Sequence, residues 1–128
     1  MLAIMFPVGK TTGLSYILVR RLQDKKPTIY CCEENFAYVF TDAGVQKVSC
    51  QAKRIAALDG PTANCCALVN IHPGMREIPW PFYPSPFRLG RVVVAASPNP
   101  AHVMDFKESR AKTFTLPTWG WDDLYCAR

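Results

Sequence analysis

LAIMFPVGKTT, residues 2–12, is an apolar run that ends in the quartet Gly-Lys-Thr-Thr. After the quartet, apolar residues recur at helical spacing, at Leu14, Ile17, Leu18 and Leu22. The stretch therefore predicts a buried strand, a tight turn and an amphipathic helix, which is the opening unit of an α/β domain.

The quartet Gly9–Thr12 matches the second half of the phosphate-binding motif G-x-x-x-x-G-K-[ST]. In that motif glycine-rich backbone surrounds the phosphates, the lysine neutralises their oxygens and the hydroxyl ligates Mg²⁺. The first half departs from it, because Ile4 replaces the first glycine and Pro7 lacks an N–H for a phosphate oxygen. An ordinary helix N-terminus is the alternative interpretation. The predicted nucleotide-binding residues are Gly9, Lys10, Thr11 and Thr12.

The composition indicates a single domain over residues 1–128 that is long enough to bury a core. No apolar run approaches the roughly 20 residues of a membrane-spanning helix, so we expect no membrane partner. Residues 1–8 have neither a positively charged start nor a small-residue cleavage site, which favours a first strand over a signal peptide. We therefore expect an intracellular protein, cytoplasmic or nuclear.

The six cysteines include two adjacent pairs, Cys31-Cys32 and Cys65-Cys66, inside strand-like runs. Adjacent side chains on a strand point to opposite faces and cannot easily share a metal ion. Neither His72 nor His102 is spaced to complete a zinc site. Free thiols in a reducing compartment are favoured over disulfides or zinc.

The formal net charge is +5, and its densest part is the group Arg20, Arg21, Lys25 and Lys26. Cations at the end of a helix complement its dipole, which explains the group without nucleic acid. No aromatic residues alternate with these cations as a base-stacking surface would require, so we do not expect nucleic-acid binding.

The remaining pattern alternates strands and helices. Pro27 ends the first helix, predicted over residues 11–24, because the residue before a proline avoids helical geometry. Further strands are predicted at 28–32, 65–71, 91–96 and 112–116, a hairpin at 36–48, and helices at about 52–58, 100–110 and from 119. This order predicts an α/β fold with a mainly parallel sheet, flanking helices and an added β-hairpin at one edge.

The segment 73–90 is the least regular, with five of the eleven prolines and four aromatic residues, Trp80, Phe82, Tyr83 and Phe87. Such proline density excludes a helix or a central strand and predicts an ordered loop. We expect its aromatic residues to pack structurally, with a peptide- or base-binding platform as the alternative.

Asn70 follows the strand-like run Cys66–Val69, where phosphate-loop nucleotidases place the aspartate that holds Mg²⁺. Asparagine keeps an oxygen ligand but loses the charge, and no glutamate follows it. Ser97, after the valine-rich strand, is either a helix cap or a sensor of the γ-phosphate. The predicted catalytic residues are thus Asn70 and Ser97, and the predicted metal ligands are Thr11 and Asn70.

The order of these segments resembles the phosphate-loop core of fungal Crinkler-type and retrotransposon-hot-spot-type proteins. The matching blocks are GKTTGLSYILVRRL, KPTIYCCEENFAYVF, CALVN, VVVAASPNPAHVMDF and TFTLPTWGWDDLY. The most specific pieces are the strand that ends in Ala-Ser-Pro and the block Leu-Pro-x-Trp-x-x-x-Asp-Leu.

The resemblance implies a three-layer P-loop NTPase sandwich, of the broad class that includes AAA-type and signal-transduction ATPases, with ATP and Mg²⁺. Lys10 would bind the phosphates and Thr11 the Mg²⁺, with Asn70 in the acidic position and Ser97 in the sensor position. The family continues into further helices, so we expect the domain to be incomplete at its C-terminus. The departures at Ile4, Pro7 and Asn70 predict ATP binding with weak or lost hydrolysis.

Three hypotheses remain at this stage, and the first of them is nucleotide binding. A protein-interaction or effector module on a relic NTPase fold would use the aromatic segment 80–87. Self-association is a further expectation, since related ATPases complete their sites across subunits, and Arg91 and Arg110 are candidate arginines by elimination. The third alternative is a truncated gene product that does not fold stably.

Overall fold

The computed structural model describes residues 2–5, 10–51, 55, 65–72, 75, 77–83, 91–96 and 112–115. Within these residues the chain forms one mixed β-sheet with an α-helix against it, which confirms the predicted α/β class. The elements are β1 (Leu2–Met5), α1 (Lys10–Gln23), β2 (Thr28–Cys31), β3 (Phe36–Thr41), β4 (Gly44–Ser49), β5 (Cys66–Asn70), the 3-10 turn η1 (Trp80–Phe82), β6 (Arg91–Ala96) and β7 (Lys112–Thr115).

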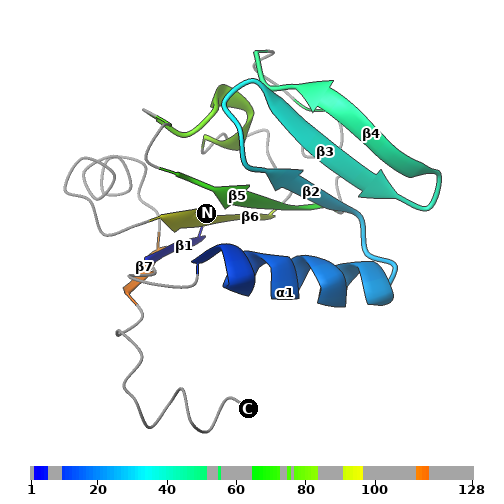
Figure 1. Ribbon diagram of the computed structural model, residues 1–128, viewed down its shortest axis with the longest axis horizontal. Coiled ribbons are helices and arrows are strands. Elements are labelled where there is room, and N and C mark those ends of the chain that lie inside the picture. The colour runs from blue at the N-terminus through cyan, green and yellow to red at the C-terminus, as the bar shows by residue number, and fades with distance from the viewer. Residues whose placement is uncertain are drawn as a thin grey trace, which may run out of the picture.

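The sheet has the strand order β4-β3-β2-β5-β6-β1-β7 (Figure 1). The strands β2, β5, β6, β1 and β7 pair in parallel with their neighbours in this order. Strands β3 and β4 form an antiparallel hairpin, and β3 pairs antiparallel with β2. The mainly parallel sheet and the hairpin at its edge are therefore as predicted. The helices expected at about 52–58, at 100–110 and from 119 fall outside the described residues, so a three-layer sandwich is not shown.

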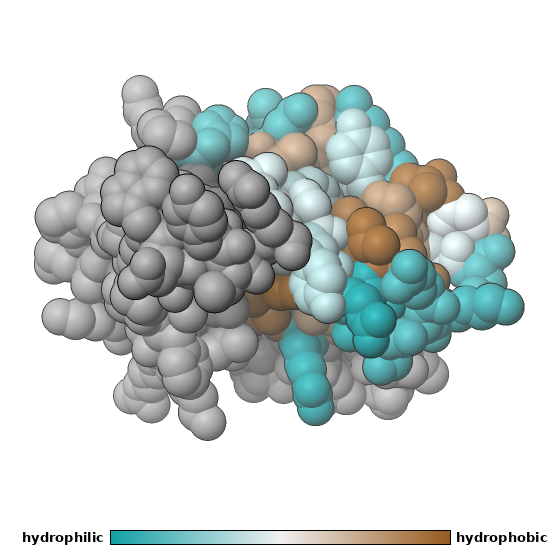
Figure 2. All heavy atoms as spheres, turned by 60° about the horizontal axis from the view of Figure 1, so that its bottom comes forward, coloured by the Kyte–Doolittle hydropathy of each residue, from teal (hydrophilic) through white to brown (hydrophobic). Residues whose placement is uncertain are grey.

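Helix α1 packs along one face of the sheet, below it in Figure 1. Leu14 is fully buried and clusters with Cys66 and Leu68 of β5, and Ile17 and Leu18 lie beside this cluster. This is the face that the helical spacing of the apolar residues predicts. The outward face carries exposed apolar side chains, and Figure 2 shows hydrophobic and hydrophilic surface side by side on this side of the molecule.

The C-terminal end of α1 is closed by backbone hydrogen bonds. The N–H of Lys25 donates to the carbonyl of Leu22, and the N–H of Lys26 donates to the carbonyl of Arg21. This pair of bonds defines a Schellman motif, in which Lys25 takes the left-handed position with φ of 53°. The Arg21 guanidinium donates to the Thr28 hydroxyl at 2.9 Å, which ties the helix end to the start of β2.

The other face of the sheet is covered partly by the proline-rich segment. Ile78 and Phe82 of this segment are buried in one cluster with Val69 and Val94 of the central strands. Trp80, between them, is 61% exposed. The predicted packing role of the segment is therefore observed for Phe82, whereas Trp80 faces outward.

Candidate functional site

Strands β1, β6 and β5 end level with one another at one edge of the sheet. Met5, the last residue of β1, pairs with Ala96, and Asn70, the last residue of β5, pairs with Ala95. From β1 the chain moves toward β2, and from β6 it moves the opposite way, toward β7. Such a reversal of strand order marks the carboxyl edge where open α/β sheets bind ligands.

Helix α1 begins at this same edge with Lys10, the lysine of the predicted phosphate loop. Its first turn contains no acidic residue, so the partial positive charge of the helix N-terminus is not neutralised by its own side chains. Free N–H groups and the helix dipole together favour an anion at such a terminus.

Thr11 and Asn70 are brought together at this edge, although 59 positions separate them. The side-chain amide of Asn70 donates to the Thr11 hydroxyl oxygen at 3.2 Å. Asn70 is only 6% exposed, and its Oδ1 atom is buried without a hydrogen-bond partner. An unpaired buried acceptor costs free energy, about 1–3 kcal/mol. The two predicted metal ligands are thus adjacent, and one of them offers an unused oxygen.

Tyr30 and Ser15 complete this polar cluster, and the sequence analysis did not identify either. Burial raises the pKa of the Tyr30 hydroxyl, while hydrogen bonds with the side chains of Asn70 and Ser15 lower it. Tyr30 therefore holds the amide of Asn70 from the β2 side. Strand alternation offered a signal: Ile29 and Cys31 face the opposite core, which places Tyr30 on the α1 face.

The other predicted site residues divide into two groups. Thr12 is exposed in the first turn of α1, at the same edge as Thr11. Gly9 and Ser97 lie outside the described residues. Ser97 directly follows Ala96, so its position in the chain places it after the strand that pairs with both β1 and β5.

Arg91 is the first residue of β6 and pairs with Cys66, at the amino ends of the strands. It therefore lies at the edge opposite Asn70 and cannot reach the predicted site of its own chain. Arg110, the other candidate arginine, falls outside the described residues.

The described cysteines, Cys31, Cys32, Cys50, Cys65 and Cys66, are free thiols, as predicted. Cys65 and Cys66 belong to the clusters on opposite faces of the sheet, as adjacent strand residues should. Burial raises the pKa of the Cys65 thiol to about 11. In the part of the chain that the structure describes, no three His, Cys, Asp or Glu side chains gather into a metal-binding group.

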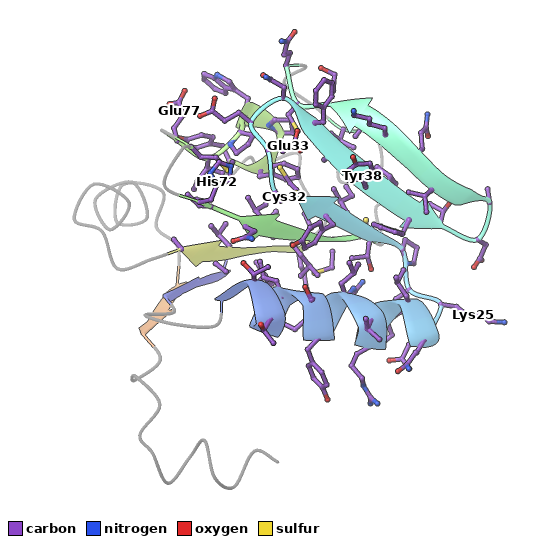
Figure 3. All side chains as sticks on the ribbon, in the orientation of Figure 1. Lys25, Cys32, Glu33, Tyr38, His72 and Glu77 are labelled. Atoms are coloured by element: carbon purple, nitrogen blue, oxygen red, sulfur yellow. The ribbon has the colours of Figure 1, made fainter. Side chains whose placement is uncertain are left out.

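Figure 3 shows further polar residues at the carboxyl edge. Cys32 and Glu33 follow β2, while His72 and Glu77 follow β5, so residues far apart in the sequence share this end of the molecule. Lys25 lies at the opposite end of α1.

Comparisons with protein-family models, with curated proteins and with solved structures found no match. No helix among the described residues is both long enough and apolar enough to cross a membrane.

Proposed function

We propose that this chain binds a nucleoside triphosphate, ATP, together with Mg²⁺, at the carboxyl edge of the sheet, and that it hydrolyses the nucleotide weakly or not at all. The observation that carries the proposal is the hydrogen bond between Asn70 and Thr11. The sequence motif selects Thr11 and Asn70 independently as metal ligands, and the fold brings these two side chains within 3.2 Å of each other.

The donor set fits Mg²⁺. This ion takes oxygen ligands, keeps several waters, and is held by one or two protein groups together with substrate phosphates. The Thr11 hydroxyl and the unpaired Oδ1 of Asn70 are two such oxygens. Because the amide nitrogen faces Thr11 in the structure, the Asn70 amide would turn over to bring both oxygens to one ion. Bound Mg²⁺ would neutralise charge on the phosphates, and Lys10 at the start of α1 would add a second positive charge.

The strand order also supports the proposal. One strand, β6, separates β1 from β5. Because the chain reverses direction between these strands, their carboxyl ends form the edge where open α/β sheets bind ligands. The resemblance to Crinkler-type proteins also points to a phosphate-loop nucleotide site.

The proposed weakness of hydrolysis rests on the neutral side-chain amide of Asn70. Asn70 supplies no negative charge, so Mg²⁺ would be held mainly through the nucleotide. Residues 71 and 72, which follow Asn70, are isoleucine and histidine and provide no carboxylate base. Lost electrostatic stabilisation of this kind typically costs about 3–4 kcal/mol of transition-state free energy per group.

The direct test is a titration of the protein with a fluorescent ATP analogue, with and without Mg²⁺. We expect saturable, Mg²⁺-dependent binding that weakens at least about tenfold in Lys10→Ala, because hydrogen bonds to charged groups contribute about 1.5–3 kcal/mol. Lys26→Ala is the matched control, since Lys26 is an exposed lysine beyond the other end of α1. Equal binding by Lys10→Ala and wild type would contradict the proposal. A cooperative melt without any binding would do the same.

A non-catalytic interaction surface is the second candidate, and the exposure of Trp80 favours it. Its ring lies 5.7 Å from that of Tyr83, and Phe82 of the same segment is fully buried. Exposed aromatic residues on a rigid base are typical of binding hot spots.

Trp80→Ala tests this second candidate. We expect it to reduce capture of a protein partner from a cell extract without changing the melting temperature, because Trp80 is 61% exposed. Tyr16→Ala, at a similarly exposed aromatic position on α1, is the control. Phe82→Ala is unsuitable, since removing a fully buried ring costs about 3–5 kcal/mol of stability. Unchanged capture by Trp80→Ala would exclude this surface.

A further inference from the structure

Two cysteines flank the turn between β2 and β3. The Sγ of Cys31, the last residue of β2, donates to the carbonyl of Glu33 at 3.1 Å and lies 3.6 Å from the carbonyl of Phe36. The backbone N–H of Cys50, which follows β4, donates to the carbonyl of Asn35 at 2.8 Å. Both cysteines therefore hydrogen-bond to carbonyls within residues 33–36, although Cys31 ends β2 and Cys50 follows β4.

The two thiols also contact each other. Both side chains are buried in the same core cluster, and a side-chain hydrogen bond joins them. This hydrogen bond lowers the pKa of the Cys50 thiol and raises that of Cys31. Cys50 is thus the sulfur that more readily becomes a thiolate, and Cys31 keeps its proton beside it.

A cavity of about 250 Å³ opens next to Cys50. The residues that line it include two acidic ones, Glu34 and Glu77, and Trp80. A cavity of this size admits a small molecule, and its carboxylates repel anions. Cys50 is therefore reachable by a small neutral reagent although its side chain is buried.

We propose that Cys50 and Cys31 form a thiol pair that a small, neutral hydroperoxide entering this cavity oxidises to a disulfide. This is a modification site separate from the nucleotide edge at Asn70. It does not depend on the proposed nucleotide binding.

The chemistry balances in two steps. The Cys50 thiolate attacks one peroxide oxygen, the O–O bond breaks, and Cys50 becomes a sulfenic acid while an alcohol or water leaves with the proton. Cys31 then attacks the Cys50 sulfur, the S–O bond breaks, and the Cys31 proton leaves with hydroxide as water. Two thiols are oxidised, and one hydroperoxide is reduced to an alcohol and water.

Other thiols of the chain serve as internal controls. Cys32 is more exposed than Cys50, but burial and, to a lesser extent, Glu33 raise its pKa. Burial likewise raises the pKa of Cys65 to about 11. If exposure alone decided reactivity, Cys32 would react before Cys50; if thiolate character decides, Cys50 reacts first.

The experiment treats the reduced full-length protein with near-equimolar hydrogen peroxide, blocks the remaining thiols at timed intervals and maps the peptides by mass spectrometry. We expect a single disulfide between Cys31 and Cys50, formed about tenfold faster than any modification of Cys32. Glutathione disulfide, which is larger and anionic, should react much more slowly. Disulfides scattered among other cysteines, or faster reaction at Cys32, would overturn the proposal.

Variants separate the two steps. Cys50→Ser should abolish disulfide formation, and Cys31→Ser should leave a sulfenic acid on Cys50 that a dimedone probe labels. Cys32→Ser is the matched control and should form the disulfide at the wild-type rate. Absence of dimedone labelling in a folded Cys31→Ser protein would count against Cys50 as the attacking thiol. The wild-type peptide map decides the matter even where a variant fails to fold.

Discussion

The side-chain amide of Asn70 determines the charge of the candidate site, because asparagine is neutral where an aspartate would be negative. Its amide hydrogen-bonds to Thr11 and contacts Tyr30 while leaving Oδ1 unpaired, so the carboxyl edge holds a buried acceptor without holding a charge. A carboxylate in the same place would bind Mg²⁺ more strongly, but it would also be a buried anion whenever the metal is absent.

Asn70→Asp is therefore expected to have opposite effects on the stability of the free protein and of the protein with ATP and Mg²⁺. Without Mg²⁺ the melting temperature should fall, because the new carboxylate is desolvated next to Thr11. With ATP and Mg²⁺ the loss should be recovered, and the fluorescent analogue should bind about tenfold more tightly. Differential scanning fluorimetry and the binding titration measure the two effects.

The control for this substitution is Asn35→Asp, at an exposed turn position. It makes the same chemical change and should alter neither quantity. If Asn70→Asp lowers the melting temperature and the addition of Mg²⁺ and ATP does not restore it, the result would argue against a metal at this position.

At the scale of elements, the succession of strands and helix from β1 to β6 follows from the local spacing of apolar and turn residues in the sequence. The quartet and the apolar spacing predict α1 within one residue at each end, and the alternation about residues 42–43 predicts the β3–β4 hairpin. Those elements form from contacts between near neighbours, which sequence periodicity records. The Thr11–Asn70 contact and the Cys31–Cys50 pair depend on how distant elements meet, which periodicity does not record.

The end of α1 permits a test at this scale. Lys25 occupies the left-handed position of the Schellman motif, where a residue with Cβ is strained. Lys25→Gly should therefore raise the free energy of unfolding by about 0.5–1 kcal/mol. Urea unfolding measures this as a higher midpoint with an unchanged slope.

Lys26→Gly is the matched control, since Lys26 is a neighbouring exposed lysine without a positive φ. It should be neutral or slightly destabilising, because glycine adds entropy to the unfolded chain. Equal stabilisation by both substitutions would indicate relief of charge repulsion rather than of backbone strain.

At the scale of the whole molecule, the buried thiols should make the free energy of unfolding depend on pH in the alkaline range. Burial raises the pKa of Cys65 from about 9.0 to about 11, so between these values the unfolded chain has lost a proton that the folded chain keeps. Raising the pH therefore favours unfolding. This contribution is fully present below pH 9 and disappears through pH 11, with a limiting slope of about 1.4 kcal/mol per pH unit.

Urea unfolding under reducing conditions from pH 7 to 10.5 measures this decline. Cys65→Ala should lower stability at pH 7 but make the dependence on pH shallower. A wild-type stability that stays constant to pH 10.5 would contradict the assignment of Cys65 as a buried, protonated thiol.

The position of β1 between β6 and β7 has a consequence for how the protein is made. Both hydrogen-bonding partners of β1 come from the last third of the chain, whereas β2, β3 and β4 each have a strand partner within the first 50 residues. Among the described strands, β1 is therefore the one that waits longest for a partner during synthesis. An apolar strand that stays unpaired until a distant partner is made is open to aggregation, so we expect the pairing of β1 with β6 to limit folding.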